Sequence, residues 1–195
     1  ELQGTSFIGV RWTAIAIGDV DNDTDPDIII SGRDASAGPN TQLYINAGNG
    51  TFSRVENSNL VPVYDGSIAL SDVDGDADLD LYVVSGGSDF PKDEPVLQDR
   101  LYINNGKGEF TLAADALPKM ISSGSVVAAQ DYDKDGDMDL FVGGRMIPGN
   151  YPYPTASYIL QNNKGKFTDV TKSIAPDLME IGMVSAGLWT DYNND

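Results

Sequence analysis

One acidic motif occurs three times in this chain of 195 residues, and the start of a fourth copy follows. The copies are DVDNDTDPD from Asp19, DVDGDADLD from Asp72 and DYDKDGDMD from Asp131, and a shorter DYNND begins at Asp191. Their first residues are separated by 53, 59 and 60 positions. Spacing this regular is the signature of a repeat protein, in which each repeat forms one supersecondary unit.

A second motif keeps the same period. It is LYINAGNGTF from Leu43, LYINNGKGEF from Leu101 and the shorter ILQNNKGKF from Ile159. Two unrelated motifs that stay in phase argue against a chance origin of the repeat. The chain is therefore built from units of about 58 residues.

Each unit contains four short segments with strand character. In the second unit they are residues 67–72, 80–86, 100–106 and 109–115. β-branched and aromatic residues are frequent in them, and the Gly-rich punctuation between the last two is typical of hairpins. Four antiparallel strands repeated at a fixed length predict the blades of an all-β propeller. Residues 172–183 are the place where we expect a single helical turn.

We treat residues 1–195 as one partial β-propeller, with about three blades and the beginning of another. Propellers have 4 to 8 blades, so three blades cannot close a ring. The chain is therefore expected to be part of a longer protein or to self-associate through its open blade edges. Two copies would supply close to seven blades.

Composition excludes several functions. The chain has 30 acidic and 12 basic residues and a formal net charge of −18, which disfavours binding to nucleic acid and to anionic membranes. No apolar run is long enough for membrane insertion. Cysteine and histidine are both absent, so disulfides, thiolate or imidazole metal sites and histidine-based catalysis are excluded. We expect that the chain is not an enzyme.

The acidic motif predicts calcium sites. Alternating carboxylates repel one another unless a cation lies between them, and Ca²⁺ accepts 6 to 8 oxygen ligands from flexible loops. We expect three structural Ca²⁺ ions, bound by side chains at positions 1, 3, 5 and 9 of each motif and by the backbone carbonyl at position 7. These residues are Asp19, Asp21, Asp23, Asp25 and Asp27; Asp72, Asp74, Asp76, Asp78 and Asp80; and Asp131, Asp133, Asp135, Asp137 and Asp139. Whether a fourth site forms at Asp191 is left open.

The acidic motif matches the remaining types of metal loop less well. An EF-hand needs a glutamate at position 12, where this chain has Ile30, Val83 and Val142. Mg²⁺ keeps its water molecules too firmly for a dense carboxylate cage, and transition metals prefer ligands that are absent here. A solvated acidic turn without an ion stays an alternative, because position 6 is glycine only in the third motif, at Gly136. We therefore expect the third site to bind most tightly.

The pattern Asp-x-Asp-x-Asp-Gly-x-x-Asp-Leu, followed by Leu-Tyr-Ile-Asn-Asn-Gly-x-Gly-x-Phe, resembles the FG-GAP/VCBS repeat of integrin-like propellers. The resemblance covers nearly the whole chain. Residues 141–171 also resemble the secreted bacterial VCBS-repeat proteins of the ASPIC/UnbV type. What the resemblance implies is a seven-bladed, calcium-stabilised propeller outside the cell, used mainly for binding.

The antiparallel order of the strands predicts where a ligand binds. The calcium loops share one face with the Gly-rich hairpins, and the longer loops 31–41, 87–99 and 143–157 lie on the other. Binding residues on rigid scaffolds are usually carried by such loops. In the third loop, Arg145, Tyr151 and Tyr153 suit a sugar or a protein hot spot. The alternative is that the two tyrosines only cover the gap between blades.

Three functions compete. The first is an extracellular or cell-surface calcium-binding module for adhesion to a protein or glycan. The second is the propeller portion of a carbohydrate-active enzyme such as a polysaccharide lyase, and the third is a structural spacer. The extracellular location follows from the calcium concentration that such loops need for occupancy.

Overall fold

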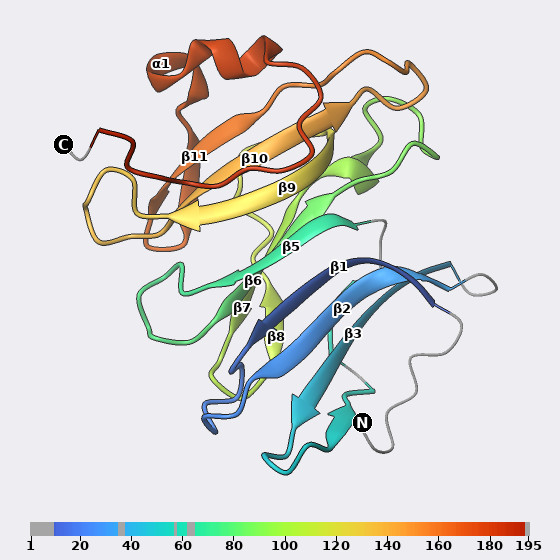
Figure 1. Cartoon of the computed structure of the whole chain (residues 1–195), viewed down its shortest axis with the longest axis vertical. Coiled ribbons are helices and arrows are strands. Elements are labelled where there is room, and N and C mark those ends of the chain that lie inside the picture. The colour runs from blue at the N-terminus through green and yellow to red at the C-terminus, as the bar shows by residue number, and fades with distance from the viewer. Residues whose placement is uncertain (1–9, 35–37, 57, 62–64, 194–195) are drawn as a thin grey trace.

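The computed structural model of the chain describes residues 10–34, 38–56, 58–61 and 65–193. These residues form three four-stranded sheets, each an antiparallel meander whose strands follow the order of the chain (Figure 1). We call the sheets blades 1, 2 and 3. The prediction of an all-β protein made of four-stranded blades is confirmed.

The strands lie close to the predicted segments. Blade 1 contains β1 (Val10–Gly18), β2 (Asp27–Asp34), β3 (Gly38–Asn46) and β4 (Phe52–Arg54). Blade 2 contains β5 (Asp65–Ser71), β6 (Asp80–Ser85), β7 (Arg100–Asn104) and β8 (Phe110–Leu112). Blade 3 contains β9 (Ser123–Gln130), β10 (Asp139–Met146), β11 (Tyr158–Asn163) and β12 (Lys166–Asp169).

The helical content is small. A 3-10 turn spans Pro95–Leu97, the short helix α1 spans Thr171–Ile174, and a second 3-10 turn spans Pro176–Glu180. The helical turn expected within residues 172–183 is therefore present. Among the described residues, no helix has the length and apolar character needed to cross a membrane.

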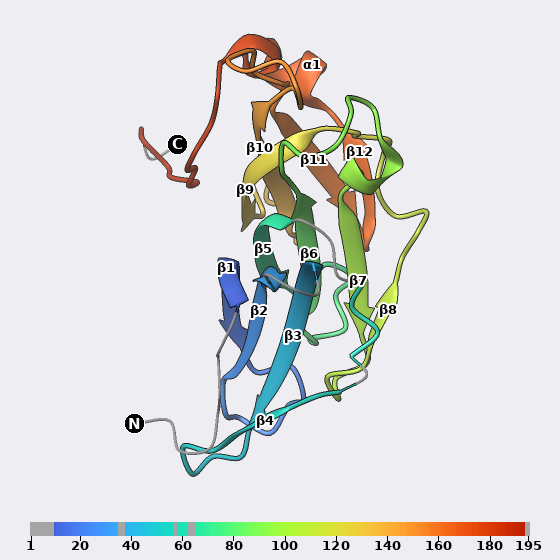
Figure 2. The same ribbon diagram turned by 90° about the vertical axis from the view of Figure 1, so that its right-hand side faces the viewer.

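The blades are arranged as in a propeller that these three blades do not close. The first strands β1, β5 and β9 contact one another in sequence and lie along one side of the molecule in Figure 2. The fourth strands β4, β8 and β12 are the outer strands of their sheets. The loops between first and second strands consequently lie beside one another on a single face.

The hydrophobic core lies between blades, because the middle sheet buries both of its faces. In β6, Leu81 and Val83 pack against blade 1, whereas Tyr82 and Val84 pack against blade 3. The alternation of side chains along a strand sends neighbouring residues to opposite faces, so a strand with neighbours on both sides is apolar almost throughout. Every residue of β6 is buried.

Polar residues join the blades at the face opposite the aspartate loops. Asp65, at the start of β5, accepts hydrogen bonds from Ser31 and from Thr41 (3.2 Å) of blade 1 and forms a 2.7 Å salt bridge with Arg100. Within blade 2 itself, Asp99 accepts hydrogen bonds from the Tyr82 hydroxyl (2.9 Å) and the Ser85 amide (2.8 Å). Burial raises the pKa of Asp99 to about 7.

The last described segment lies alongside blade 3. The amide of Val184 donates to the Gly144 carbonyl (2.9 Å), and the Trp189 indole donates to the Ala128 carbonyl (3.0 Å). The Trp189 ring stacks on Tyr132, with ring centroids 5.7 Å apart. Residues 184–190 thus contact blade 3 in the way that β5 contacts blade 1 and β9 contacts blade 2.

Two loops on the face opposite the aspartates were predicted with wrong boundaries, and one of them, expected at residues 143–157, begins only after β10 ends at Met146. The first loop on the face opposite the aspartates was expected to span residues 31–41, but β2 continues to Asp34 and β3 begins at Gly38. Cross-strand pairing from Ser31–Thr41 to Asp34–Gly38 extends the sheet through this segment. The two strands therefore stay paired beyond the apolar segment, because backbone hydrogen bonding between strands does not require apolar side chains.

Candidate metal centres

The three acidic motifs occupy equivalent places in the fold. Each joins the first strand of a blade to the second: β1 to β2, β5 to β6 and β9 to β10. The antiparallel pair holds the two ends of the motif together, since its last aspartate pairs with the end of the first strand, as Asp80 does with Ser71. The motif is thereby closed into a tight loop.

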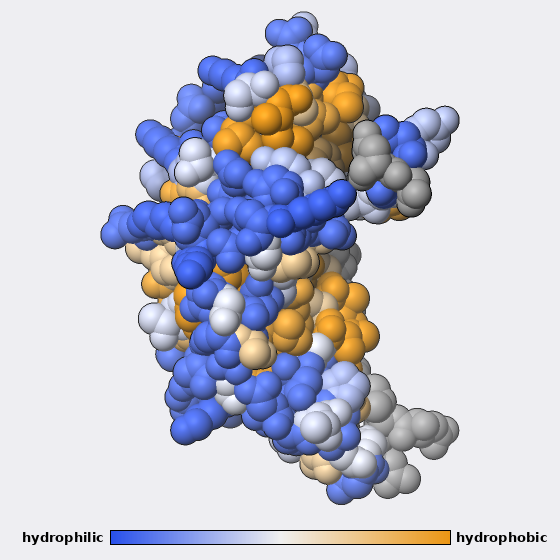
Figure 3. Space-filling view, turned by 90° about the vertical axis from the view of Figure 1, so that its left-hand side faces the viewer, coloured by the Kyte–Doolittle hydropathy of each residue, from blue (hydrophilic) through white to orange (hydrophobic). Residues whose placement is uncertain are grey.

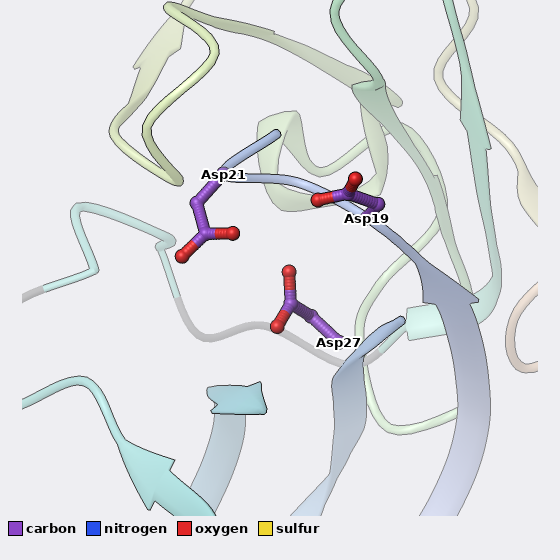
Figure 4. A group of neighbouring side chains, drawn as sticks. All are labelled: Asp19, Asp21 and Asp27. Carbon is purple, nitrogen blue, oxygen red and sulfur yellow. The ribbon is translucent and has the colours of Figure 1, made fainter. Parts of the chain in front are cut away.

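Three aspartates converge in each loop, from positions 1, 3 and 9. The triads are Asp19, Asp21 and Asp27; Asp72, Asp74 and Asp80; and Asp131, Asp133 and Asp139. In each, one carboxylate oxygen per residue lies within 4.8 Å of the others. Figure 4 shows the first triad, with its carboxylates facing a common centre. Bonds of 2.3–2.6 Å let one calcium-sized ion contact oxygens up to about 5 Å apart.

The aspartate at position 9 connects the loop to the third strand. Asp80 accepts a hydrogen bond from the Val73 amide (3.0 Å) on one oxygen and from the Asn104 amide (2.9 Å) on the other. The corresponding residues Asp27 and Asp139 make the same pair of contacts in their own blades. All three side chains are buried, so they form the base of each centre.

The remaining predicted ligands lie outside the triads. At position 5, Asp23, Asp76 and Asp135 accept the amide N–H two residues further on, at 2.9–3.0 Å. At position 7, Asp137 accepts the Lys164 amide (3.0 Å) and Asp78 accepts the Asn22 side chain (2.6 Å). The side chain at position 7 therefore points away from the metal centre. This agrees with the prediction, which assigned only the backbone carbonyl of this residue to the metal.

Two residues in each loop have left-handed backbone conformation. At position 6, Gly136 has φ 99°, as predicted, and Thr24 and Ala77 adopt φ 77° and 74° at the same place. Position 4, which the sequence did not single out, also has positive φ, for example 64° at Lys134. A residue with a Cβ atom is strained in this region, so the loops store strain that a ligand can offset.

The electrostatics of the triads favour a bound cation. Burial raises the pKa of Asp80 to about 6, although the hydrogen bonds from Asn104 and Val73 oppose the shift. Burial also raises the pKa of Asp27 and Asp139. For Asp21, burial is the main cause of a raised pKa, and repulsion by Asp27 and Asp23 adds to it. Carboxylates held together in their charged form need a positive charge between them.

One atom gives an independent test of the fit. Oδ1 of Asp21 is buried and has no hydrogen-bond partner among the described residues. A buried carboxylate oxygen without a partner is costly, and a metal ion in the triad would supply one. The residues of the first loop therefore suit a hard divalent cation.

The structure identifies residues that sequence reasoning missed. Asn104 donates its side-chain amide to the carbonyl of Val20 (2.8 Å), which lies in the aspartate loop of the preceding blade, and Asn162 does the same to Val73 (2.7 Å). Gln161 donates to Oδ2 of Asp133 at 2.6 Å. The repeated Asn of the second motif was the available signal, but it did not indicate a contact between blades.

The residues expected to bind a ligand lie on β10 and on the loop that follows it. Arg145 is exposed near the end of β10. Tyr151 and Tyr153 are 72% and 67% exposed, so they do not fill the gaps between the three described blades. The loop is closed by hydrogen bonds between Ile147 and Tyr153 (2.9 Å) and between Tyr153 and Asn150 (2.8 Å).

The fourth acidic motif is only partly described. Asp191 and Asn193 lie near the third loop, around a hollow of ≈ 620 Å³ that Asp131 and Tyr132 also line. Asp195, the third oxygen donor of this motif, lies outside the described residues. In the part of the chain that the structure describes, aspartates form triads only in the first three loops.

Comparison with protein families gives one result. A model described as an FG-GAP-like repeat matches residues 19–83 and again residues 72–142. The two matches overlap and together cover more than half of the chain, and each begins at the first aspartate of a loop. A search of curated proteins found no match.

Proposed function

We propose that this chain, which belongs to the FG-GAP-like repeat family, is a calcium-stabilised propeller module that binds a protein or glycan outside the cell. The observation that carries the proposal is the threefold recurrence of one carboxylate triad at the same place in three consecutive blades. Backbone hydrogen bonds explain why the aspartate at position 9 is buried, but a solvated acidic turn does not require two more carboxylates to converge on it in every copy.

Calcium is the cation that best suits these loops. The donors available in each loop are carboxylate and carbonyl oxygens, which matches the preference of Ca²⁺ for oxygen ligands. The buried aspartate at position 9 ties the loop to the third strand, and a cation in the triad would tie it to the other side of the loop as well. Calcium would thus contribute to the stability of each blade.

The face opposite the calcium loops is the one that we assign to the ligand. The side from which the aspartate loops project is strongly hydrophilic across its centre (Figure 3). On the opposite side, Tyr151 and Tyr153 offer exposed rings on the loop that follows Arg145, and such rings stack on sugars or anchor protein contacts. We expect substitution of these three residues to weaken ligand binding without changing calcium binding.

A binding role is favoured over catalysis by the composition of the chain, which contains neither histidine nor cysteine. The extracellular location is proposed because FG-GAP repeats are typical of extracellular proteins, where calcium is abundant enough to fill loops of moderate affinity. A polysaccharide lyase or a spacer would share the calcium sites. Turnover of a uronic polysaccharide would establish the former, and a glycan array would separate a binding module from a spacer.

The test of the proposal is a calorimetric titration of metal-free protein with CaCl₂, followed by thermal unfolding with and without calcium. We expect about three sites per chain and a higher melting temperature in calcium. A site at 100 times its Kd stabilises the fold by about 2.7 kcal/mol. MgCl₂ is the matched control, and it should bind more weakly.

Two results would refute the proposal. Absence of calcium binding at millimolar concentrations would mean that the loops are solvated turns. Binding that leaves the melting temperature unchanged would show that the ions do not stabilise the blades.

A further inference from the structure

A continuous chain of hydrogen bonds connects the first two aspartate triads. The Val20 amide donates to Asp27 (2.9 Å), and the Val20 carbonyl accepts the side-chain amide of Asn104 (2.8 Å). The backbone amide of Asn104 then donates to Oδ1 of Asp80 (2.9 Å). Asp27 and Asp80 belong to different triads in different blades.

The same chain continues from the second triad to the third. The Val73 amide donates to Oδ2 of Asp80 (3.0 Å), and the Val73 carbonyl accepts the side chain of Asn162 (2.7 Å). The backbone amide of Asn162 donates to Oδ1 of Asp139 (2.8 Å). One oxygen of Asp80 is therefore connected to blade 1 through Asn104, and the other is connected to blade 3 through Val73.

The valine is the residue that transmits a change in one loop. Val73 lies between Asp72 and Asp74, two members of its triad, so a cation that fixes both aspartates also fixes the peptide groups on either side of Val73. Its side chain is 3% exposed in the core between blades 2 and 3, which restricts its movement further. The direction of the Val73 carbonyl, and with it the position of Asn162, thus depends on the order of the second loop.

We propose that Asn104 and Asn162 are positioning residues that couple neighbouring metal centres, so that a cation in one loop raises the affinity of the next. The inference rests on the proposed function, because it concerns calcium binding at the same triads. A coupling of this kind is reciprocal, and each centre must favour the other by the same factor. Calcium would then be taken up and lost over a narrower concentration range than three independent sites would show.

The chain contains its own control for this idea. Asn46 has the same place in blade 1, and its backbone amide donates to Asp27 (2.8 Å). Its side chain donates to the Pro26 carbonyl (3.1 Å) of its own loop, and the described part of the chain gives it no contact with another blade. Replacing Asn46 therefore removes the local role of the asparagine without touching the connection between blades.

The second junction is the sharper one to test, because at the first the Val20 carbonyl also accepts the Gly108 amide (2.8 Å). In an Asp21→Asn background, which disables the first centre, calcium binding at the third centre is followed by the NMR signal of the Gly136 amide, which donates to Asp131. The second centre is left intact or disabled by Asp74→Asn. We expect the Kd of the third centre to rise at least about fivefold when the second is disabled.

The asparagine variants assign the coupling to a residue. The coupling is measured as the Kd of the third centre with the second centre disabled, divided by its Kd with the second centre intact. Asn162→Leu should bring this ratio close to one, whereas Asn46→Leu should leave it unchanged. A loss of structure alone would weaken the third centre equally with and without its neighbour and would not alter the ratio. Asn162→Asp, which keeps the oxygen that accepts the Gly165 amide but lacks the donor, serves if the leucine variant does not fold.

The outcomes separate the coupling from the proposed function. A ratio of one in the presence of Asn162 would overturn the coupling and leave calcium binding intact. A ratio that persists in both Asn162 variants would overturn the role of this residue. Absence of calcium binding at Gly136 in the otherwise unmodified chain would refute the proposed function itself.

Discussion

Asp133 is the most exposed member of its triad, and this makes it the clearest residue for testing the metal centre. In calcium, Asp133→Ala should lose the ion of the third loop and lower stability by about 2–3 kcal/mol at high occupancy. In metal-free protein it should change little, because the hydrogen bonds that Asp133 accepts from Gln161 and from the Asp135 amide are exposed to water. Thermal unfolding in both conditions measures the difference.

Asp115→Ala is the matched control for that experiment, because Asp115 is also exposed and lies outside the loops. It should unfold like the unmodified protein in both conditions. An Asp133→Ala protein whose melting temperature in calcium equals that of the unmodified protein would exclude Asp133 as a ligand.

Asp80 makes the stability of the metal-free protein depend on pH. Its pKa in the folded chain is about 6, compared with an ordinary value of 3.8, so the folded state binds this proton more tightly than the unfolded chain. Protonation therefore stabilises the fold, and that contribution, about 1–2 kcal/mol after solvent screening, is lost as pH rises through 6. We expect metal-free protein to unfold at a higher temperature at pH 5 than at pH 7.5.

Calcium should reduce or reverse this trend, because the ion binds the deprotonated carboxylates. Asp99 also has a raised pKa, of about 7, but it lies outside the loops, so its effect should be present with and without calcium. The informative quantity is thus the difference between the two pH profiles. A metal-free protein that loses stability from pH 7.5 to 5 would contradict the prediction.

At the scale of the element, each aspartate loop is a conformation that the two flanking strands impose. Ala77 has φ 74°, a left-handed value that costs a residue with a Cβ atom about 1–2 kcal/mol. Ala77→Gly removes this cost but adds about 0.4–1 kcal/mol of flexibility to the unfolded chain. We expect a net stabilisation of roughly 0.5–1 kcal/mol, measured by denaturant unfolding.

Ala114→Gly provides the comparison for this prediction. Ala114 is exposed and does not have positive φ, so its replacement should only destabilise the fold. If both substitutions destabilised the protein equally, the left-handed conformation of Ala77 would carry no strain.

At the scale of the molecule, one face of blade 1 is not covered by any of the described residues. Ile15 and Ile17 of β1 are 58% and 63% exposed, whereas Ile68, at the place in β5 that corresponds to Ile15, is 7% exposed against blade 1. In blade 2, the residues at these positions are covered by blade 1. In blade 1, the corresponding residues are exposed, because no other blade among the described residues covers them. An exposed apolar face of this kind favours association.

We expect this face to support self-association with a second copy of the chain. Sedimentation velocity at increasing concentration should show it, and Ile17→Asp should suppress it without lowering the melting temperature of the monomer. Leu112→Asp, at an exposed position on β8, is the control and should associate normally. Equal association of both variants would exclude the β1 face as the contact.

Local sequence was sufficient to predict the blades and the aspartate loops. Segments rich in β-branched and aromatic residues, Gly-rich hairpins and the spacing of the aspartates depend on neighbours along one strand or turn, so they can be recognised without the fold. Gly136 was placed correctly for this reason, since a tight turn requires left-handed φ at one defined position. The triads at positions 1, 3 and 9 also lie within one loop.

Tertiary structure alone decided how the loops are connected. Asn104 and Val20 are 84 residues apart, and Asn162 and Val73 are 89 apart, so no periodicity within a repeat could indicate that they meet. The stacking of blades brings them together. The same stacking buries Ile68 and leaves Ile15 exposed, although both residues have the same place in their strands.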